Sequence, residues 1–234
     1  MNQNKFIEEL KKINIEITDK QLEQLEIYYE LLIEYNKVMN LTGITDHDEV
    51  YLKHFYDSLT IAKIIDITKE ETLCDVGTGA GFPGMVLKII FPNLKVTLVD
   101  SLNKRIEFLK VVKEKLKLTN IEIIHSRIED YAKDNREKFD IVTSRAVANL
   151  SILLEYAIPL VKVNKYFIAM KGNAKEEIEE GKNAFKVLNS YIEKSLEFKL
   201  PIENSQRNLI KIKKISITNK KYPRKYSEIK KKKL

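Results

Sequence analysis

Apolar residues recur at helical spacing along the N-terminal third of the chain. Within residues 18–40 the apolar and aromatic positions that follow this period are Leu22, Leu25, Tyr28, Tyr29, Leu32, Ile33 and Val38. Thr18 or Asp19 is expected to cap the start of this helix. A further helical stretch covers residues 47–65, so the pattern predicts a helical extension over residues 1–66.

From residue 72 onward the pattern alternates between short apolar strands and amphipathic helices. Strands are predicted over residues 72–76, 95–100, 121–125, 139–145, 165–172, 193–200 and 207–213. Helices are predicted over residues 84–91, 102–118, 150–161 and 174–190. Strands that alternate with helices favour a parallel, doubly wound sheet, whereas the last two strands share a short loop and predict an antiparallel hairpin. We therefore expect a seven-stranded, mostly parallel sheet over residues 67–215.

Composition restricts the class of protein further. With 234 residues, of which 44% are hydrophobic and 32% charged, the chain can bury the core of one α/β domain. The single cysteine, Cys74, excludes a disulfide scaffold and is typical of a reducing compartment. The chain opens without a signal-peptide pattern, and its apolar stretches are far shorter than the ~20 residues that span a bilayer. We expect a cytoplasmic protein without a membrane segment.

The net charge of +7 is concentrated at the C-terminus. Residues 211–234 hold eleven Lys and Arg but only one acid, Glu228, so this segment carries +10 and residues 1–210 carry −3. Such a segment is typical of an arm that binds a polyanion, usually nucleic acid, and also of a merely solvating tail. We treat residues 216–234 as a basic tail separate from the main domain.

Glycine is concentrated at the end of the first strand. Four of the seven glycines in the chain lie within eight residues: Gly77, Gly79, Gly81 and Gly84. Glycine allows the backbone to turn sharply and to approach a ligand closely. A dinucleotide-binding fingerprint requires a third glycine three positions after Gly79, where this chain has Phe82. The spacing therefore disfavours a dinucleotide and its diphosphate.

An acid stands in a suitable place after this loop. Asp100 ends the second strand, 23 residues after Gly77. A G-x-G-x-G loop followed by such an acid resembles the first motif of the class I S-adenosylmethionine (SAM) methyltransferases, in which the loop packs against the methionine and ribose and the acid binds the ribose hydroxyls. The alternative is a tight turn followed by a strand-end acid. The resemblance implies a Rossmann-like class I SAM-dependent methyltransferase fold, with SAM as the methyl donor.

The chain lacks the residues that several mechanisms of methyl-acceptor activation require. Methylation of pyrimidine C5 needs a cysteine nucleophile, but Cys74 lies inside a core strand. The chain has no Pro-Pro pair of the kind that marks amino-group methylation, and Ser144 and Arg145 stand where metal-dependent enzymes have acids. No His, Cys and acid residues show metal-ligand spacing, so no metal is predicted. An acceptor that is already nucleophilic, such as guanine N7, remains.

Arginines and an acid at the strand ends are the main candidates for the chemistry. Arg145 ends an apolar strand on the ligand side of the sheet, where it can contact the SAM carboxylate, a phosphate or the acceptor base. Its alternative is a structural pair with an acid such as Glu155. Arg127 and Glu129 follow the third strand, where they contribute to the site or form an ordinary surface ion pair.

Basic residues near the same edge are candidates for RNA contact. Lys104 and Arg105 open the helix after Asp100 and line the acceptor site or a solvated helix face. Lys171 ends the fifth strand. His54 and Asp57 form a catalytic pair or, as we favour, pin the N-terminal helices over the site.

Seven sequence motifs occur in an order that indicates one family. They are NLTGIT (40–45), HFYDSL (54–59), DVGTGAGFPG (75–84), LVDSLNKRIEFL (98–109), SRIED (126–130), FDIVTSRAVA (139–148) and MKG (170–172). Over residues 20–215 the chain resembles the bacterial small-subunit ribosomal RNA methyltransferase G family, also called glucose-inhibited division protein B. The resemblance implies methylation of N7 of one guanine in 16S rRNA. The chain departs from many relatives at Asn164, where they have glycine, and in its more basic C-terminus.

The resemblance and the motifs together give a set of site residues. The expected SAM-binding residues are Asp75, Gly77, Gly79, Gly81, Phe82, Asp100, Ile128, Glu129 and Arg145. Catalytic roles are expected for Arg145 and Arg127. RNA contacts are expected from Lys104, Arg105, Lys171 and Arg224.

The expected partner is 16S rRNA or the 30S subunit, bound by a monomer. We expect the basic tail to bind RNA without affecting SAM. Two alternatives stay open: a small-molecule methyltransferase with a solubilising tail, and a non-enzymatic RNA-binding module.

Overall fold

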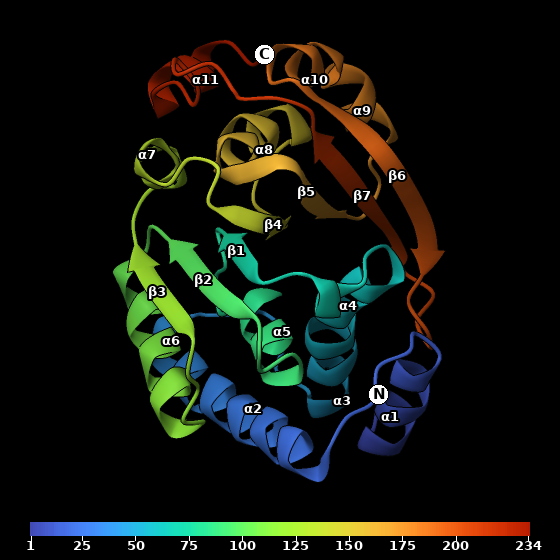
Figure 1. Ribbon diagram of the computed structural model, residues 1–234. Coiled ribbons are helices and arrows are strands. Elements are labelled where there is room, and N and C mark those ends of the chain that lie inside the picture. Colours follow the sequence, from blue (N-terminus) through green and yellow to red (C-terminus); the bar gives the residue numbers. More distant parts are fainter.

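The computed structural model describes residues 1–234 and contains one seven-stranded sheet with helices on both of its faces (Figure 1). The strands are β1 Thr72–Val76, β2 Lys95–Asp100, β3 Ile121–His125, β4 Phe139–Arg145, β5 Val161–Lys171, β6 Ser190–Lys199 and β7 Gln206–Lys214. Their order in the sheet is β3-β2-β1-β4-β5-β7-β6. β1 to β5 pair in parallel, and β7 runs antiparallel to both β5 and β6. The expected mostly parallel sheet with an antiparallel C-terminal hairpin is confirmed.

The helices divide between the two faces of the sheet. The α-helices are α1 Gln3–Lys11, α2 Asp19–Met39, α3 His47–Val50, α4 Asp57–Leu59, α5 Gly84–Ile90, α6 Asn103–Lys115, α7 Ile128–Asp134, α8 Leu150–Ala157, α9 Lys175–Glu180, α10 Lys182–Val187 and α11 Tyr226–Lys231. Short 3-10 and π segments are η1 Tyr51–Tyr56, η2 Thr60–Lys63, η3 Ile67–Lys69 and η4 Ile158–Leu160. None of the helices is long and apolar enough to span a membrane.

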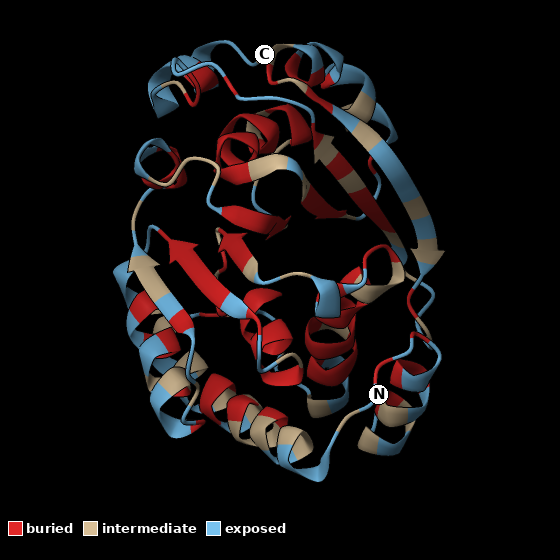
Figure 2. Cartoon of the chain, viewed as in Figure 1, coloured by how far each residue is buried: buried red, intermediate tan, exposed pale blue.

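Successive strand residues face two separate hydrophobic cores. Leu73 of β1 packs in a core of 41 buried residues with the N-terminal helices, α5 and α6. Its neighbour Cys74 faces a second core of 26 buried residues with α7, α8 and α10. Figure 2 shows β1, β2, β4 and α5 largely buried between the outer helices, whereas the edge strands β3 and β6 are mostly exposed or half-buried.

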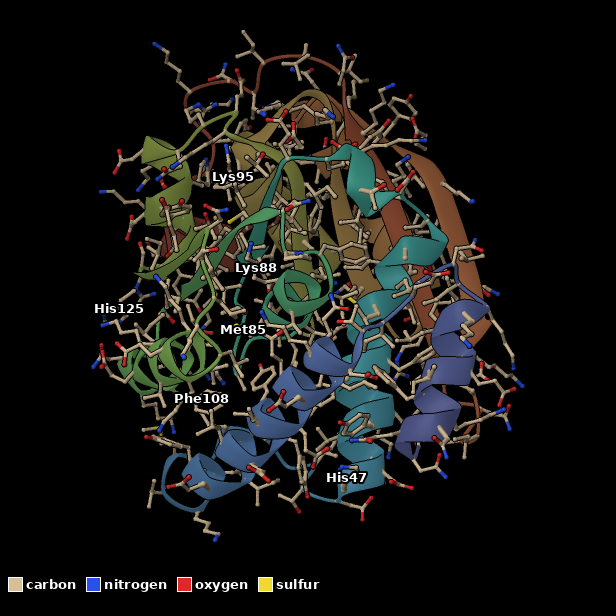
Figure 3. The ribbon with its side chains drawn as sticks, turned by 60° about the horizontal axis from the view of Figure 1, so that its bottom comes forward. His47, Met85, Lys88, Lys95, Phe108 and His125 are labelled. Atoms are coloured by element: carbon tan, nitrogen blue, oxygen red, sulfur yellow. The ribbon has the colours of Figure 1, made fainter.

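The N-terminal helices cover the first core. Thr18, one of the two residues expected to cap this helix, caps α2 through a reciprocal capping box with Gln21. α2 crosses α5 and α6, and Figure 3 shows this crossing from below, with Phe108 of α6 at the contact. The Phe108 ring lies 6.3 Å from that of Tyr28 and 5.7 Å from that of Tyr35, both on α2. The extension is therefore packed against the sheet domain and not linked to it loosely.

The structure differs from the pattern-based elements in three respects. The expected helix 174–190 is two helices, α9 and α10, which meet at Gly181, and β6 begins at residue 190. β5 begins at Val161, within the expected helix 150–161. The helices α1, α7 and α11 are too short and polar for the apolar pattern to reveal, since packing stabilises them. Asn164 has a φ of 67°, a conformation that glycine or asparagine tolerates best.

The basic C-terminal segment folds back onto the domain. Arg136 donates hydrogen bonds to the carbonyls of Tyr222 (2.6 Å) and Thr218 (2.5 Å). Tyr222 and Ile229 are buried in the second core. Residues 218–231 therefore pack against the sheet domain, because their apolar side chains and backbone carbonyls find partners there.

Candidate functional site

A cavity of about 580 Å³ opens at the carboxyl ends of the central parallel strands. Its lining residues are Leu41, Thr42, His54, Gly77, Thr78, Gly79, Ala80, Phe82, Asp100, Ser101, Arg105, Arg127, Ile128, Glu129, Arg145, Ala146, Val147, Tyr156 and Tyr226. Residues that follow β1, β2, β3 and β4 thus meet in one hollow, which is where open α/β sheets bind their ligands.

The glycine loop owes its shape to positive φ angles and a buried acid. Gly77, Gly79 and Gly81 have φ angles of 70°, 62° and 104°, which other residues adopt only with strain. Below the loop, Asp75 accepts hydrogen bonds from the Thr78 hydroxyl (2.7 Å) and the Gly84 amide (2.8 Å). Asp75 is fully buried, and this burial raises the pKa of its carboxyl to about 6.

The N-terminal extension supports the same loop from the other side. The Tyr28 hydroxyl donates to the Ala80 carbonyl, and a Cβ placed on Gly81 would lie 2.5 Å from that hydroxyl. A Cβ on Gly77 would lie 2.5 Å from Cγ2 of Val147. Two of the glycines are therefore required by close packing as well as by backbone conformation.

Asp100 lines the cavity and is almost fully buried. Its Oδ2 accepts from the Gly79 amide at 2.9 Å and from Nη1 of Arg105 at 3.2 Å, and its Oδ1 accepts from the Leu102 amide at 2.9 Å. The carboxylate is thus fixed between the glycine loop and α6. Further acceptor capacity on its two oxygens suits ligand hydroxyls.

Arg145 ends β4 and forms a charged network with the N-terminal extension. Its Nη1 donates to Asp57 Oδ2 at 3.0 Å and to the Lys53 carbonyl at 2.9 Å. Asp57 Oδ1 accepts from Nε of Arg207 at 3.0 Å, so one buried carboxylate holds two guanidinium groups. The Arg145 guanidinium also lies 5.2 Å from the Phe82 ring centroid.

His54 joins this network as a neutral ring. It stacks on Phe82 with centroids 4.4 Å apart, and its Nδ1 lies 3.3 Å from Nη2 of Arg145. Nδ1 also lies 3.2 Å from the Lys53 carbonyl, and Nε2 lies 2.8 Å from the Thr42 hydroxyl, so both ring nitrogens have hydrogen-bond partners. Burial first, and the Arg145 charge second, lower the pKa of His54 to about 3.

The wall after β3 is aromatic and apolar. Ile128 and Glu129 begin α7, and Tyr156 of α8 lies beside them along the cavity. Tyr226 of α11 completes this wall, with the Arg127 guanidinium 5.6 Å from its ring centroid. The Arg127 side chain is 62% exposed and lies 3.8 Å from the Glu129 carboxylate.

A second cavity of about 620 Å³ adjoins the first. The residues that line both cavities are His54, Arg145, Ala146 and Val147. Lys53, Lys171 and Arg207 line only the second, with Asp57 and Glu177 as its acids. The second cavity therefore carries more cationic than anionic side chains.

The GidB family model, described as rRNA small subunit methyltransferase G, matches residues 21–210. The chain belongs to this family. It is 54% identical to the Ribosomal RNA small subunit methyltransferase G of Bacillus licheniformis, with 96% of this chain and 95% of that protein covered. It is 51% identical to the protein of that name from Exiguobacterium sibiricum, with 96% of each covered.

Structural comparison supports the same fold. A SAM-dependent methyltransferase from Aquifex aeolicus aligns with a TM-score of 0.51 and 18% identity, covering 76% of this chain and 96% of that one. The class I SAM-dependent methyltransferase fold expected from the glycine loop is confirmed. As a member of the methyltransferase G family, the chain is a SAM-dependent rRNA methyltransferase.

The expected SAM residues of this methyltransferase fall into two groups. Seven of them line the first cavity: Gly77, Gly79, Phe82, Asp100, Ile128, Glu129 and Arg145. Asp75 and Gly81 do not line it; they lie beneath the loop, where they fix its shape. An acid for ribose hydroxyls, an apolar wall for a base and a loop that admits close approach fit SAM.

The expected RNA residues are more dispersed. Arg105 lines the first cavity and Lys171 the second, whereas Lys104 donates to the Met39 carbonyl at 2.6 Å. Arg224 forms a bidentate pair with Glu155, at 2.8 and 2.7 Å. The structural partner that was considered for Arg145 therefore belongs to Arg224, and Arg145 pairs with Asp57 instead.

Several lining residues carry no signal in the sequence. Tyr156 and Tyr226 had no motif to mark them, and Arg207 reaches Asp57 across 150 residues of chain. The motif around His54 and Asp57 was a usable signal, and its favoured interpretation, pinning of the N-terminal helices over the site, agrees with the contacts described above.

Proposed function

We propose that this protein transfers the methyl group of SAM to N7 of a guanine in 16S rRNA. The observation that carries the proposal is the pair of adjoining cavities that share Arg145. One cavity has the glycine loop and Asp100 for SAM, and the other has the cationic lining that suits an RNA phosphate. Family membership supports rRNA as the substrate class.

The residues around Arg145 suit an acceptor that needs no general base. His54 is neutral, with a pKa of about 3, and already uses both ring nitrogens in hydrogen bonds. Cys74 is fully buried in β1, and burial raises the pKa of its thiol. Asp57 is engaged by two arginines. Guanine N7 carries a free lone pair at neutral pH, so orientation and exclusion of water are the chain's tasks.

Specific residues would hold the donor in this scheme. SAM, when bound, supplies an electrophilic methyl group on a positively charged sulfur. Asp100 would hold the ribose hydroxyls, and Ile128 and Glu129 the adenine. The glycine loop and Arg145 would hold the methionine end. The stacked rings of Phe82 and His54 lie where the two cavities adjoin and would limit the access of water to the reacting atoms.

RNA contacts in this proposal come from several elements. Lys171, at the end of β5, and Arg207, on β7, line the acceptor cavity. Arg105 at the first cavity and Lys104 on the same helix extend the basic surface, and Arg224 stays a predicted contact of the basic segment. A catalytic role for Arg127 also stays a prediction, since it lies beside Tyr226 and does not line the second cavity.

Action as a monomer stays a prediction. Whether the acceptor is free 16S rRNA or the 30S subunit is decided by assay. Purified protein with radiolabelled SAM should methylate one of these and not free guanosine, and nuclease digestion should release the label as 7-methylguanosine. Label on guanosine alone would favour a small-molecule enzyme, and absence of SAM binding would favour a non-enzymatic RNA-binding module.

A further inference from the structure

The C-terminal segment, residues 218–231, meets the cofactor cavity at one residue. We propose that this segment forms the adenine-side wall of the SAM site and that Tyr226 packs against the adenine base. The inference rests on the proposed function, in which SAM occupies the first cavity. It assigns a cofactor role to a segment whose charge is typical of an RNA-binding arm or of a solvating tail.

The segment is fixed to the domain by a buried carboxylate. Glu155 of α8 is fully buried, and its Oε1 accepts from both the amide (2.9 Å) and Nε (2.8 Å) of Arg224. Its Oε2 accepts from Nη2 of Arg224 at 2.7 Å. A bidentate, charge-assisted pair with an added backbone bond defines the position of the chain two residues before Tyr226.

A second anchor precedes the first. Arg136 donates to the carbonyls of Thr218 and Tyr222, and the Tyr222 side chain is buried. Ile229 of α11 is buried on the same side. Because contacts hold the chain both before and after Tyr226, the place of this tyrosine is a property of the fold.

Unlike the buried Tyr222 and Ile229, Tyr226 of this segment is exposed. Its side chain is 47% exposed although it is large and aromatic, and it lines the first cavity together with Ile128, Glu129 and Tyr156. The Arg127 guanidinium lies on its ring at 5.6 Å. An exposed aromatic ring at the edge of an apolar wall is suited to stacking on a planar base.

The strand order shows which part of SAM this wall would meet. Across the sheet the order β4, β1, β2, β3 places Arg145, the glycine loop, Asp100 and Ile128 in succession. With the ribose at Asp100, the methyl group lies towards Arg145, where the second cavity adjoins. The adenine then lies on the opposite side, towards Ile128 and Tyr226.

Calorimetric titration with two ligands tests this assignment. Tyr226→Ala should weaken SAM binding by about 3–10-fold, the range for loss of an aromatic contact, and Tyr226→Phe should restore most of the affinity. Methylthioadenosine keeps the adenosine and lacks the amino acid, so it should lose affinity to the same extent. Tyr191→Ala removes a comparably exposed tyrosine of β6 that lines neither cavity, and should bind as the unmodified protein does.

The outcomes are distinct. Unchanged affinity of Tyr226→Ala for both ligands overturns the inference and leaves the proposed function standing. A loss for SAM but not for methylthioadenosine also overturns it, because the contact would then be with the methionine end. If the unmodified protein does not bind SAM, the proposed function fails, and the inference with it.

Fluorescence gives an independent readout that a purely structural role would not produce. The chain has no tryptophan, so Tyr226→Trp introduces the sole indole. Its emission should change with saturable dependence on SAM, and that of Tyr191→Trp should not. Emission from residue 226 that does not respond to saturating SAM would contradict the contact.

Discussion

Asp57 and Arg145 form an ion pair at 3.0 Å that joins the N-terminal helical extension to the end of β4. The same carboxylate binds Arg207 of β7, also at 3.0 Å. Three elements that are distant in sequence therefore meet at the point where the two cavities adjoin. The extension belongs to the working site because it supplies the acid that orients Arg145.

Asp57→Asn removes this orienting charge and leaves two partly buried guanidinium groups without their counter-ion. We expect a loss of stability of about 1–3 kcal/mol and a slower methyl-transfer step, since Arg145 loses its fixed position. Urea unfolding and single-turnover assays with 30S subunits measure the two effects. Asp66→Asn changes an acid outside both cavities and is the control. An unchanged single-turnover rate for Asp57→Asn would show that the pair is only structural.

Asp100→Ala should weaken SAM binding by about 1–3 kcal/mol, because it removes charge-assisted hydrogen bonds to the ribose. Isothermal titration measures the affinity directly. Asp130→Ala, which changes an acid that lines neither cavity, serves as the matched control. Equal SAM affinity of Asp100→Ala and the unmodified protein would refute the ribose assignment.

Gly81→Ala should both destabilise the protein and weaken SAM binding. The φ of 104° disfavours any side chain, and the new Cβ would lie 2.5 Å from the Tyr28 hydroxyl and 2.9 Å from Leu109. Backbone strain of this kind costs about 1–3 kcal/mol. Gly172→Ala meets no atom within 4 Å and has no positive φ, so it should be nearly neutral. Similar unfolding midpoints for the two variants would contradict this account of the loop.

His54 should make the protein less stable as the pH falls. Its pKa is about 3 in the folded state and near 6.5 when unfolded, so the unfolded state binds more protons between these values. Stability from this group is complete above pH 6.5 and is lost as the pH falls towards 3. The slope is at most about 1.4 kcal/mol per pH unit.

Asp75 acts in the opposite direction, because its raised pKa of about 6 makes the folded state the better proton binder between pH 4 and 6. Comparison with His54→Gln separates the two effects, since both proteins keep Asp75. The stability of the unmodified protein relative to His54→Gln should decrease from pH 7 to pH 4 in urea unfolding. A constant difference over this range would show that His54 does not titrate as described.

The parts of the site that the sequence predicted are local. A strand, a loop of alternating glycines and an acid at the next strand end are set by neighbouring residues and by the register of parallel strands. Gly77 and Asp100 were therefore found from spacing alone. Gly81 packs against Tyr28, and Asp75 accepts a hydrogen bond from the Gly84 amide. The spacing of residues in the sequence does not reveal these contacts.

The parts that escaped prediction depend on long-range pairing. A sequence offers many acids for one arginine, and nothing in it shows that Arg145 pairs with Asp57 and not with Glu155. The docking of residues 218–231 depends on Arg136 and Glu155, which lie far back in the chain. The high charge of this segment indicates an exposed tail, and the pattern does not reveal that Tyr222 and Ile229 are buried and attach it to the domain.

The most direct test of the central claim, N7 methylation of a guanine in 16S rRNA, is to map 7-methylguanosine in 16S rRNA from cells with and without this protein. Chemical cleavage at 7-methylguanosine should reveal one position that is modified in its presence and unmodified in its absence. Expression of the unmodified protein should restore that signal, and expression of folded Arg145→Ala should not. The same 7-methylguanosine pattern in cells with and without the protein would contradict the account. So would the finding that cells without the protein lack a methyl group on an atom other than guanine N7.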